Sequence, residues 1–112
     1  MNQSHAEFVP VFKALSDETR LRIMDMLSSE EMCACRILEE FSISQSTLSY
    51  HMKILSECGI VNARRDGAWM KYTINKERAE EALAFFQRIV GEKTDRIGRQ
   101  GTPEESASDQ KK

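Results

Sequence analysis

The spacing of apolar residues changes at Gly59, and this change restricts the fold more than any other feature of the chain. Ser44 can cap a helix, and the 14-residue run that follows it ends at Cys58, directly before the glycine. Within the run, apolar residues recur at three- and four-residue intervals and form one face. This face consists of Leu48, Met52 and Leu55. The sequence therefore predicts a helix over 45–58.

After Gly59, the pattern from 60 to 74 has a period of two residues, which is typical of a half-buried strand. Asp66 and Gly67 interrupt it, and this dipeptide favours a two-residue hairpin turn. The sequence predicts a β-hairpin centred on Asp66–Gly67 and joined directly to the preceding helix.

Other periodic segments predict further helices on both sides of this unit. They lie at about 5–14, 17–28, 34–41 and from Asn75 to near Gly91. Two helices separated by a short turn and followed by a hairpin are the parts of a winged helix-turn-helix, whose second helix enters the major groove of DNA. The expected fold is thus mostly α with a small β-hairpin wing.

The chain has 112 residues, enough for one modest domain, which we expect over 1–92. Residues 93–112 are polar, and we expect them to form a disordered tail. No apolar run approaches the roughly 20 residues that span a bilayer, and no secretory signal is visible, so we expect a cytoplasmic protein without a membrane partner. Three cysteines are an odd number, which favours reduced thiols over a disulfide framework.

The formal net charge of −2 argues against general binding of nucleic acid by a basic surface. However, residues 44–73 carry four Lys or Arg against two Asp or Glu. Polar side chains suited to base and phosphate contacts occur on the predicted second helix, and cations occur on the hairpin. A solvated surface is the alternative, and for His51 a position at the edge of the core is another. The candidate DNA contacts are Gln45, Ser46, Thr47, Ser49, Tyr50, His51, Lys53, Arg64, Arg65 and Lys71.

Four separated segments resemble the ArsR/SmtB family of bacterial metalloregulatory repressors, in order and in register over about 8–74. They are FKALSDETRLRI at 12–23, CAC at 33–35, SQSTLSYHMKIL at 44–55 and GIV at 59–61. The resemblance implies a homodimer that binds an inverted-repeat operator without ligand. It also implies release of the operator when a thiophilic metal or metalloid binds.

Cys33 and Cys35 are the candidate effector site, because thiolates are soft ligands that favour trivalent arsenic or antimony, zinc, cadmium and copper(I) over hard cations. Residues two apart point in nearly opposite directions on a helix but to one side of an extended chain, so one ion can bridge them only outside regular helix. Ligation should therefore disturb the start of helix 34–41. That helix would pack against the DNA-reading helix, and its change would reposition Ser46 and Ser49.

Arsenic-responsive proteins of the family that this chain resembles have a third cysteine where this chain has Leu38. Three completions of the site stay open: Cys58 as the third ligand, a small thiol or solvent, or an organoarsenical that needs only two thiolates. Other members bind zinc through Asp and His in the last helix. Residues 75–92 contain no His, so that second site is excluded.

Apolar stripes on the first and last predicted helices suggest a homodimer interface, since so small a domain leaves apolar surface exposed. The alternative is that both stripes complete the monomer's own core. The expected interface residues are Phe8, Phe12, Leu83, Phe86 and Val90.

An enzyme is not expected, because the sequence has no phosphate loop, no HExxH motif and only two His. A stronger alternative is a thiol redox switch of the same fold, in which Cys33 and Cys35 or Cys58 oxidise and alter DNA binding. A winged helix that binds protein rather than DNA is a third possibility.

Overall fold

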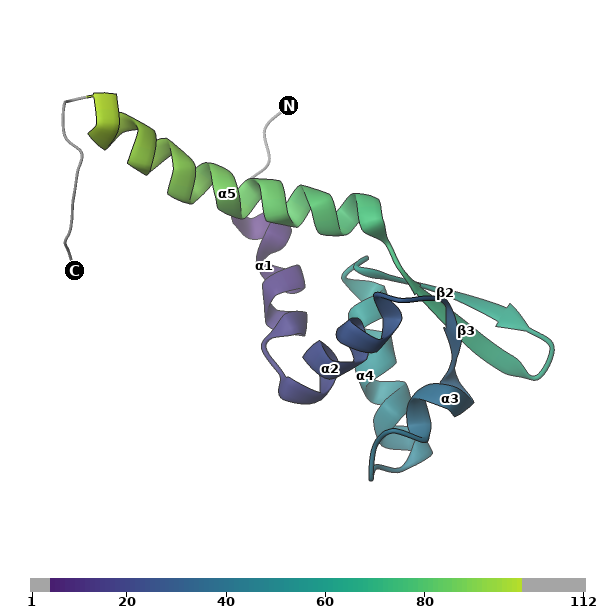
Figure 1. Ribbon diagram of the computed structural model, residues 1–112. Coiled ribbons are helices and arrows are strands. Elements are labelled where there is room, and N and C mark those ends of the chain that lie inside the picture. Colours follow the sequence, from purple (N-terminus) through teal and green to yellow (C-terminus); the bar gives the residue numbers. More distant parts are fainter. Residues whose placement is uncertain (1–4, 100–112) are drawn as a thin grey trace. The chain divides into compact units, whose positions relative to one another are not determined.

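The computed structural model describes the backbone of residues 5–99 and the side chains of residues 5–91. Among the described residues, no helix combines the length and the apolar character that a membrane span requires. The elements follow one another in the order that Figure 1 shows. They are α1 (His5–Leu15), α2 (Glu18–Leu27), β1 (Met32–Cys33), α3 (Ala34–Leu38), α4 (Gln45–Glu57), β2 (Val61–Asp66), β3 (Trp69–Ile74) and α5 (Lys76–Arg99).

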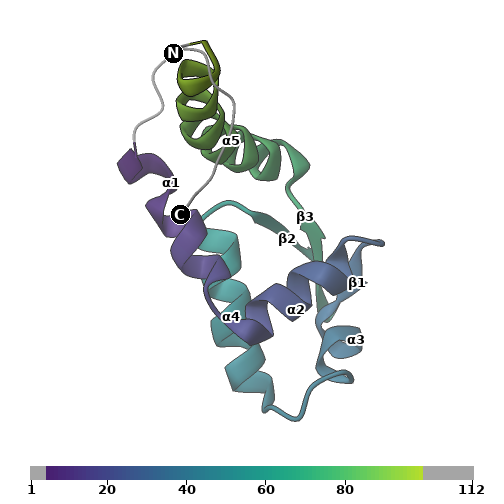
Figure 2. The ribbon, with the colours of Figure 1, turned by 60° about the vertical axis from the view of Figure 1, so that its left-hand side comes forward.

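The chain divides into two compact units, with the boundary between Glu80 and Glu81 inside α5. In the first unit, the apolar face predicted for α4 is confirmed: its three residues are at most 2 % exposed. Ile23 of α2 and Ile37 of α3 are completely buried. The winged helix-turn-helix arrangement is also confirmed, with α3 and α4 joined by residues 39–44 (Figure 2).

Local capping interactions explain where the helices begin and end. The Ser44 side chain accepts a hydrogen bond from the Thr47 backbone N–H, and that of Asp17 accepts one from Arg20 N–H, so each satisfies a free donor of a first helical turn. Gly59 has a φ of +89°, a left-handed conformation that ends α4 at low cost because glycine has no Cβ.

The sheet has three antiparallel strands in the order β1-β3-β2. Strand β1 gives Met32 and Cys33 an extended conformation. The hairpin turn differs from the prediction: Asp66 pairs with Trp69, so the two turn residues are Gly67 and Ala68 rather than Asp66 and Gly67. Gly67 has a φ of +66°, as the first central residue of a type II′ turn requires, so the turn needs only one glycine.

Two predicted helix ends were wrong. Helix α3 ends at Leu38 instead of 41, because three-residue turn bonds from Glu40 N–H to Ile37 O and from Phe41 N–H to Leu38 O replace the helical pattern. Helix α5 continues through Gly91 to Arg99, since an interior glycine weakens a helix by only about 1 kcal/mol and need not end it. Of the predicted disordered tail, 93–99 is therefore helical, and 100–112 lies outside the described residues.

Candidate nucleic-acid interface and cysteine pair

Helix α4 presents a row of exposed polar side chains beside and opposite its buried face. The N-terminal part of this row is ordered by Ser44: its hydroxyl lies 3.1 Å from that of Ser46 and donates to that of Thr47 over 3.0 Å. Tyr50 is 61 % exposed. We refer to the six exposed residues as the reading row; they are Gln45, Ser46, Thr47, Ser49, Tyr50 and Lys53.

His51 does not belong to this row and lies at the edge of the core, which is the alternative that the sequence left open for it. Its side chain is only 12 % exposed, and its Nδ1 lies 2.9 Å from Arg20 Nη1, which donates to it, and 4.0 Å from a carboxylate oxygen of Asp17. Arg20 Nε also donates to Ala14 O over 2.6 Å. His51 therefore ties α4 to the junction of α1 and α2. No local sequence pattern indicates Arg20 as a partner of His51, because the two residues are 31 positions apart.

The hairpin β2–β3, called the wing below, extends from the end of α4 (Figure 1). Two of its three predicted DNA-contacting cations are paired with carboxylates. Arg64 forms a bidentate salt bridge with Glu31: its Nε and Nη2 donate to the two carboxylate oxygens over 2.9 and 2.8 Å. Its Nη1 also lies 3.9 Å from a carboxylate oxygen of Asp66. Lys71 Nζ lies 2.9 Å from Asp66. Within residues 5–91, Arg65 makes no ion pair.

These ion pairs shift the titration of the acids. The hydrogen bond from Arg64 is the main cause that lowers the pKa of Glu31, and the bond from Lys71 is the main cause that lowers the pKa of Asp66. In this structure Glu31 and Asp66 therefore occupy the two wing cations Arg64 and Lys71. No local sequence pattern indicates Glu31 as part of this surface, because it is 33 residues away from Arg64.

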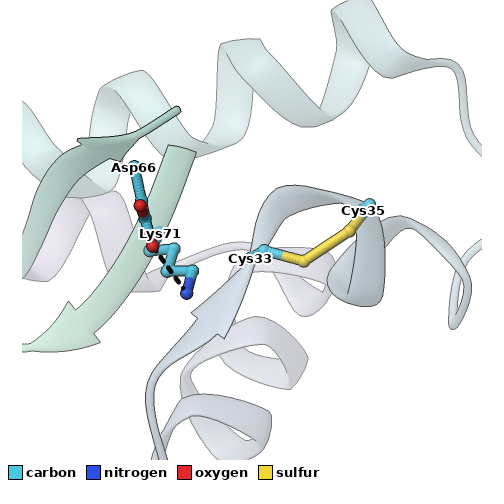
Figure 3. Close-up of a disulfide and its surroundings, with 4 residues drawn as sticks. All are labelled: Cys33, Cys35, Asp66 and Lys71. Carbon is cyan, nitrogen blue, oxygen red and sulfur yellow. Dashed lines mark ion pairs between the residues drawn. A yellow bond between two sulfur atoms is a disulfide. The ribbon is translucent and has the colours of Figure 1, made fainter. Parts of the chain in front are cut away.

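Cys33 and Cys35, called the cysteine pair below, lie where β1 passes into α3 (Figure 3). Cys33 is the N-cap residue of α3 and has an extended backbone, with φ −81° and ψ 156°, while Cys35 is in the first turn. Their Cα atoms are 5.4 Å apart and the sulfurs are joined in a disulfide, whereas the sequence led us to expect reduced thiols. The extended backbone at Cys33 allows both sulfurs to lie on one side of the chain. A disulfide between them and the binding of one ion by the two sulfurs both require this arrangement.

The structure does not bring Cys58 to the cysteine pair. Cys58 is the C-cap residue of α4, donates a weak hydrogen bond to Leu55 O over 3.4 Å, and lines a separate cavity with Pro10 and Ile54. Among the described residues, no three His, Cys, Asp or Glu side chains form a group that could hold a metal ion. In this conformation, the described residues therefore do not group Cys58 with the cysteine pair as a third ligand.

The residues predicted for the dimer interface fall into two classes. Phe8 is completely buried and is therefore a core residue. The Cζ atom of Arg78 lies over its ring, 4.7 Å from the ring centre. The other four are each at least 40 % exposed: Phe12, Leu83, Phe86 and Val90.

Comparisons with known proteins agree with this geometry. Residues 17–63 match the family described as bacterial regulatory protein, arsR family. An arsenical resistance operon repressor of Staphylococcus xylosus is 46 % identical over 66 % of this chain and 71 % of its own length. This chain belongs to the ArsR family.

Two further comparisons extend the family assignment beyond the matched segment. An uncharacterized HTH-type transcriptional regulator of Methanocaldococcus jannaschii is 38 % identical over 78 % of this chain and 99 % of its own length. An ArsR-like transcriptional regulator from Rhodococcus sp. RHA1 has a similar structure, with a TM-score of 0.74, 27 % identity, and coverage of 85 % and 90 % of the two chains. As an ArsR-family protein, this chain is a DNA-binding transcriptional repressor and not an enzyme.

Proposed function

We propose that this ArsR-family repressor binds an inverted-repeat operator as a cytoplasmic homodimer and releases it when trivalent arsenic or antimony binds the cysteine pair. The convergence of two soft sulfur donors at the β1–α3 junction carries this proposal. The similarity to an arsenical resistance operon repressor of Staphylococcus xylosus supports the choice of effector.

Binding requires the reduced protein, so a cellular thiol must first convert the disulfide to two thiols. Arsenite then loses two of its hydroxyl groups: each As–O bond is replaced by an As–S bond, and each thiol proton leaves with a hydroxide as water. Arsenic stays trivalent throughout. A small thiol or a solvent hydroxyl keeps the third position, because the described residues supply no third protein ligand.

Two structural connections link the cysteine pair to the DNA-contacting surface. Helix α3 begins within the pair and packs against α4, so ligation that reshapes its first turn moves the support of the reading row. Strand β1 ends at Cys33 and begins one residue after Glu31, the partner of Arg64 on the wing. Release of DNA needs an effector that binds the DNA-incompetent form more tightly than the DNA-bound form.

In the proposed complex, the reading row enters the major groove and the wing cations contact phosphates. Gln45, the first residue of α4, is suited to bidentate bonding with adenine. Twofold symmetry would place two copies of α4 about one DNA turn apart, at the two halves of the operator.

The test starts with a duplex selected from random DNA by the full chain. Fluorescence anisotropy then follows its release by arsenite or antimonite from protein reduced with a phosphine. We expect Cys33→Ser and Cys35→Ser to abolish the response, and Cys58→Ser, the matched control, to retain it. Operator affinity unchanged by saturating arsenite and antimonite would refute the proposal. Release by peroxide with no response to either metalloid would instead indicate a redox switch.

A further inference from the structure

A cleft of about 450 Å³ lies between α3, α4 and the wing, and the proposed function makes no use of it. Its volume is within the range of about 300–1,000 Å³ that is typical of small-molecule sites. Apolar side chains form much of the lining, among them Leu38, Leu48, Met52 and Met70. The cleft therefore offers an apolar surface to a molecule of modest size.

The register of the sheet shows which strand residues share the side of this cleft. Arg65 lies opposite Met70 across β2–β3, and Tyr72 lies opposite Met32 across β1–β3. Opposed residues share a face of the sheet, and so do residues two apart on one strand. Arg65, Met70 and Tyr72 therefore lie on one face, and all three line the cleft. Cys33 pairs with Lys71 and belongs to the other face.

Tyr72 carries a polar group that the fold leaves without a partner. The residue is 8 % exposed, and its hydroxyl makes no hydrogen bond with another residue in the described part of the chain. A buried hydroxyl without a hydrogen bond is unfavourable, so such groups point to a partner outside the fold. Burial raises the pKa of Tyr72, so the hydroxyl keeps its proton at neutral pH and can donate.

We propose that the cleft binds a small organic monocarboxylate with an apolar body, whose carboxylate accepts hydrogen bonds from Tyr72 and Arg65. Residues that are diagonal to each other across two strands, as these two are, lie about 7–8 Å apart, within reach of long side chains. Arg65 makes no ion pair within residues 5–91, and a guanidinium fits a carboxylate with two parallel bonds. This site goes beyond the proposed function and does not depend on the cysteine pair.

The other lining residues define the rest of the ligand. Glu39 also lines the cleft, and its negative charge disfavours a second carboxylate on the ligand. Contact with Leu38 and with the thioethers of Met52 and Met70 favours an aliphatic or aromatic body. An apolar cavity of about 150 Å³ is sufficient to bind benzene, so the cleft has room for a phenyl ring on a short chain. A suitable probe is 3-phenylpropanoate.

The cleft connects this ligand to the DNA-contacting surface. Gln45 and Ser49 of the reading row line it, as does Arg65, which is also proposed to contact DNA. A carboxylate bound to Arg65 removes a cation that would otherwise meet a phosphate. The ligand and the operator should therefore lower each other's affinity, by the same factor in both directions.

The experiment measures binding of 3-phenylpropanoate to the full, phosphine-reduced chain by isothermal titration calorimetry. We expect a dissociation constant below about 1 mM, and binding at least about tenfold weaker for the neutral 3-phenylpropanamide. Tyr72→Phe removes only the hydroxyl and should weaken binding of the carboxylate about tenfold. Tyr50→Phe is the matched control for probe binding, because Tyr50 is the other tyrosine of the chain, is 61 % exposed and lies outside the lining. It should leave the affinity for the probe unchanged.

Two further variants complete the test. Arg65→Gln should also weaken probe binding about tenfold, and it serves if circular dichroism shows that Tyr72→Phe is unfolded. The double variant Cys33→Ser/Cys35→Ser should bind the probe like the unmodified chain, although it loses its arsenite response under the proposed function. Failure of this site and failure of the proposed function are therefore distinguishable.

Fluorescence anisotropy tests the link to DNA. Saturating 3-phenylpropanoate should lower the affinity of the unmodified chain for its selected duplex about fivefold, and Tyr72→Phe should need about tenfold more probe for the same effect. Absence of saturable binding, or equal binding of the probe by Tyr72→Phe and Arg65→Gln, would overturn the site. Equal binding of the amide would overturn the assignment of a carboxylate. Binding that leaves the affinity for the duplex unchanged would overturn the link to the operator.

Discussion

Cys33 lies directly opposite Lys71 across the β1–β3 pair, and Lys71 in turn lies opposite Arg64 across the β3–β2 pair. Directly opposed residues of antiparallel strands have side chains on the same face of the sheet. Cys33, Lys71 and Arg64 thus form one row from the cysteine pair to the wing, and Figure 3 shows Lys71 with its ion-pair partner Asp66 beside the two cysteines. A shift of β1 on ligation would be transmitted directly to two wing cations.

The pairing of Arg64 with Glu31 leads to a prediction about DNA affinity. Glu31→Gln should raise operator affinity about two- to fivefold at moderate salt, because it frees the Arg64 guanidinium for a phosphate. Fluorescence anisotropy measures the effect. Glu30→Gln is the control, since it removes the same charge at the neighbouring position, and Arg64 is paired with Glu31 and Asp66. If both variants bind alike, the ion pair does not restrain Arg64.

The lowered pKa values of Glu31 and Asp66 predict a dependence of stability on pH. An acid whose pKa is lower in the folded state stabilises the fold above its unfolded pKa, which is about 4, and loses this contribution as pH falls through the folded value. The double variant Glu31→Gln/Asp66→Asn should therefore be less stable than the unmodified chain at pH 7, with the difference disappearing below about pH 3. Urea midpoints across this range measure it; a difference that grows on acidification would contradict the assignment.

The contact between Arg20 and His51 predicts a structural role for both residues. His51→Leu removes the acceptor from a partly buried guanidinium and should lower the free energy of unfolding by about 1–3 kcal/mol in urea denaturation. His51→Gln, which supplies an amide oxygen as acceptor, should lose less. Both variants should bind the selected duplex within about twofold of the unmodified chain when folded, in contrast to Gln45→Ala, which should lose discrimination worth about 1–3 kcal/mol at one base. Selective loss of DNA binding in His51→Gln would instead indicate that His51 contacts DNA.

The exposed apolar residues of α5 predict the assembly state. Leu83 is 57 % exposed, and Leu83→Glu would place a charge in the proposed homodimer interface, where its desolvation opposes association. Sedimentation velocity at micromolar concentration should show a dimer for the unmodified chain and a monomer for this variant. Ala84→Glu, an added charge at an exposed position of the same helix about 100° around its axis from Leu83, should remain dimeric. A monomer in the unmodified chain would exclude the interface.

Much of the fold could be predicted because its signals are local. The cap at Ser44, the buried face of α4 and the stop at Gly59 all lie within one run of residues, and each depends on backbone geometry that the neighbouring residues determine. The ends of α3 and α5 were less predictable, since Gly91 is compatible with both a helix end and a helix interior.

The sequence by itself determined the helices, the wing, the family and the choice of the cysteine pair, because periodicity, caps and the CxC spacing act over a few residues. Only the tertiary structure decided which of the candidate residues are exposed and which are held by other side chains. In the structure, His51 contacts Arg20 and Arg64 contacts Glu31. Cys58 lines a separate cavity, and Cys35 lines a cleft of its own. The physical reason is that hydrogen bonds, ion pairs and cavities form between segments about 30 residues apart, and no local pattern fixes which side chains meet there.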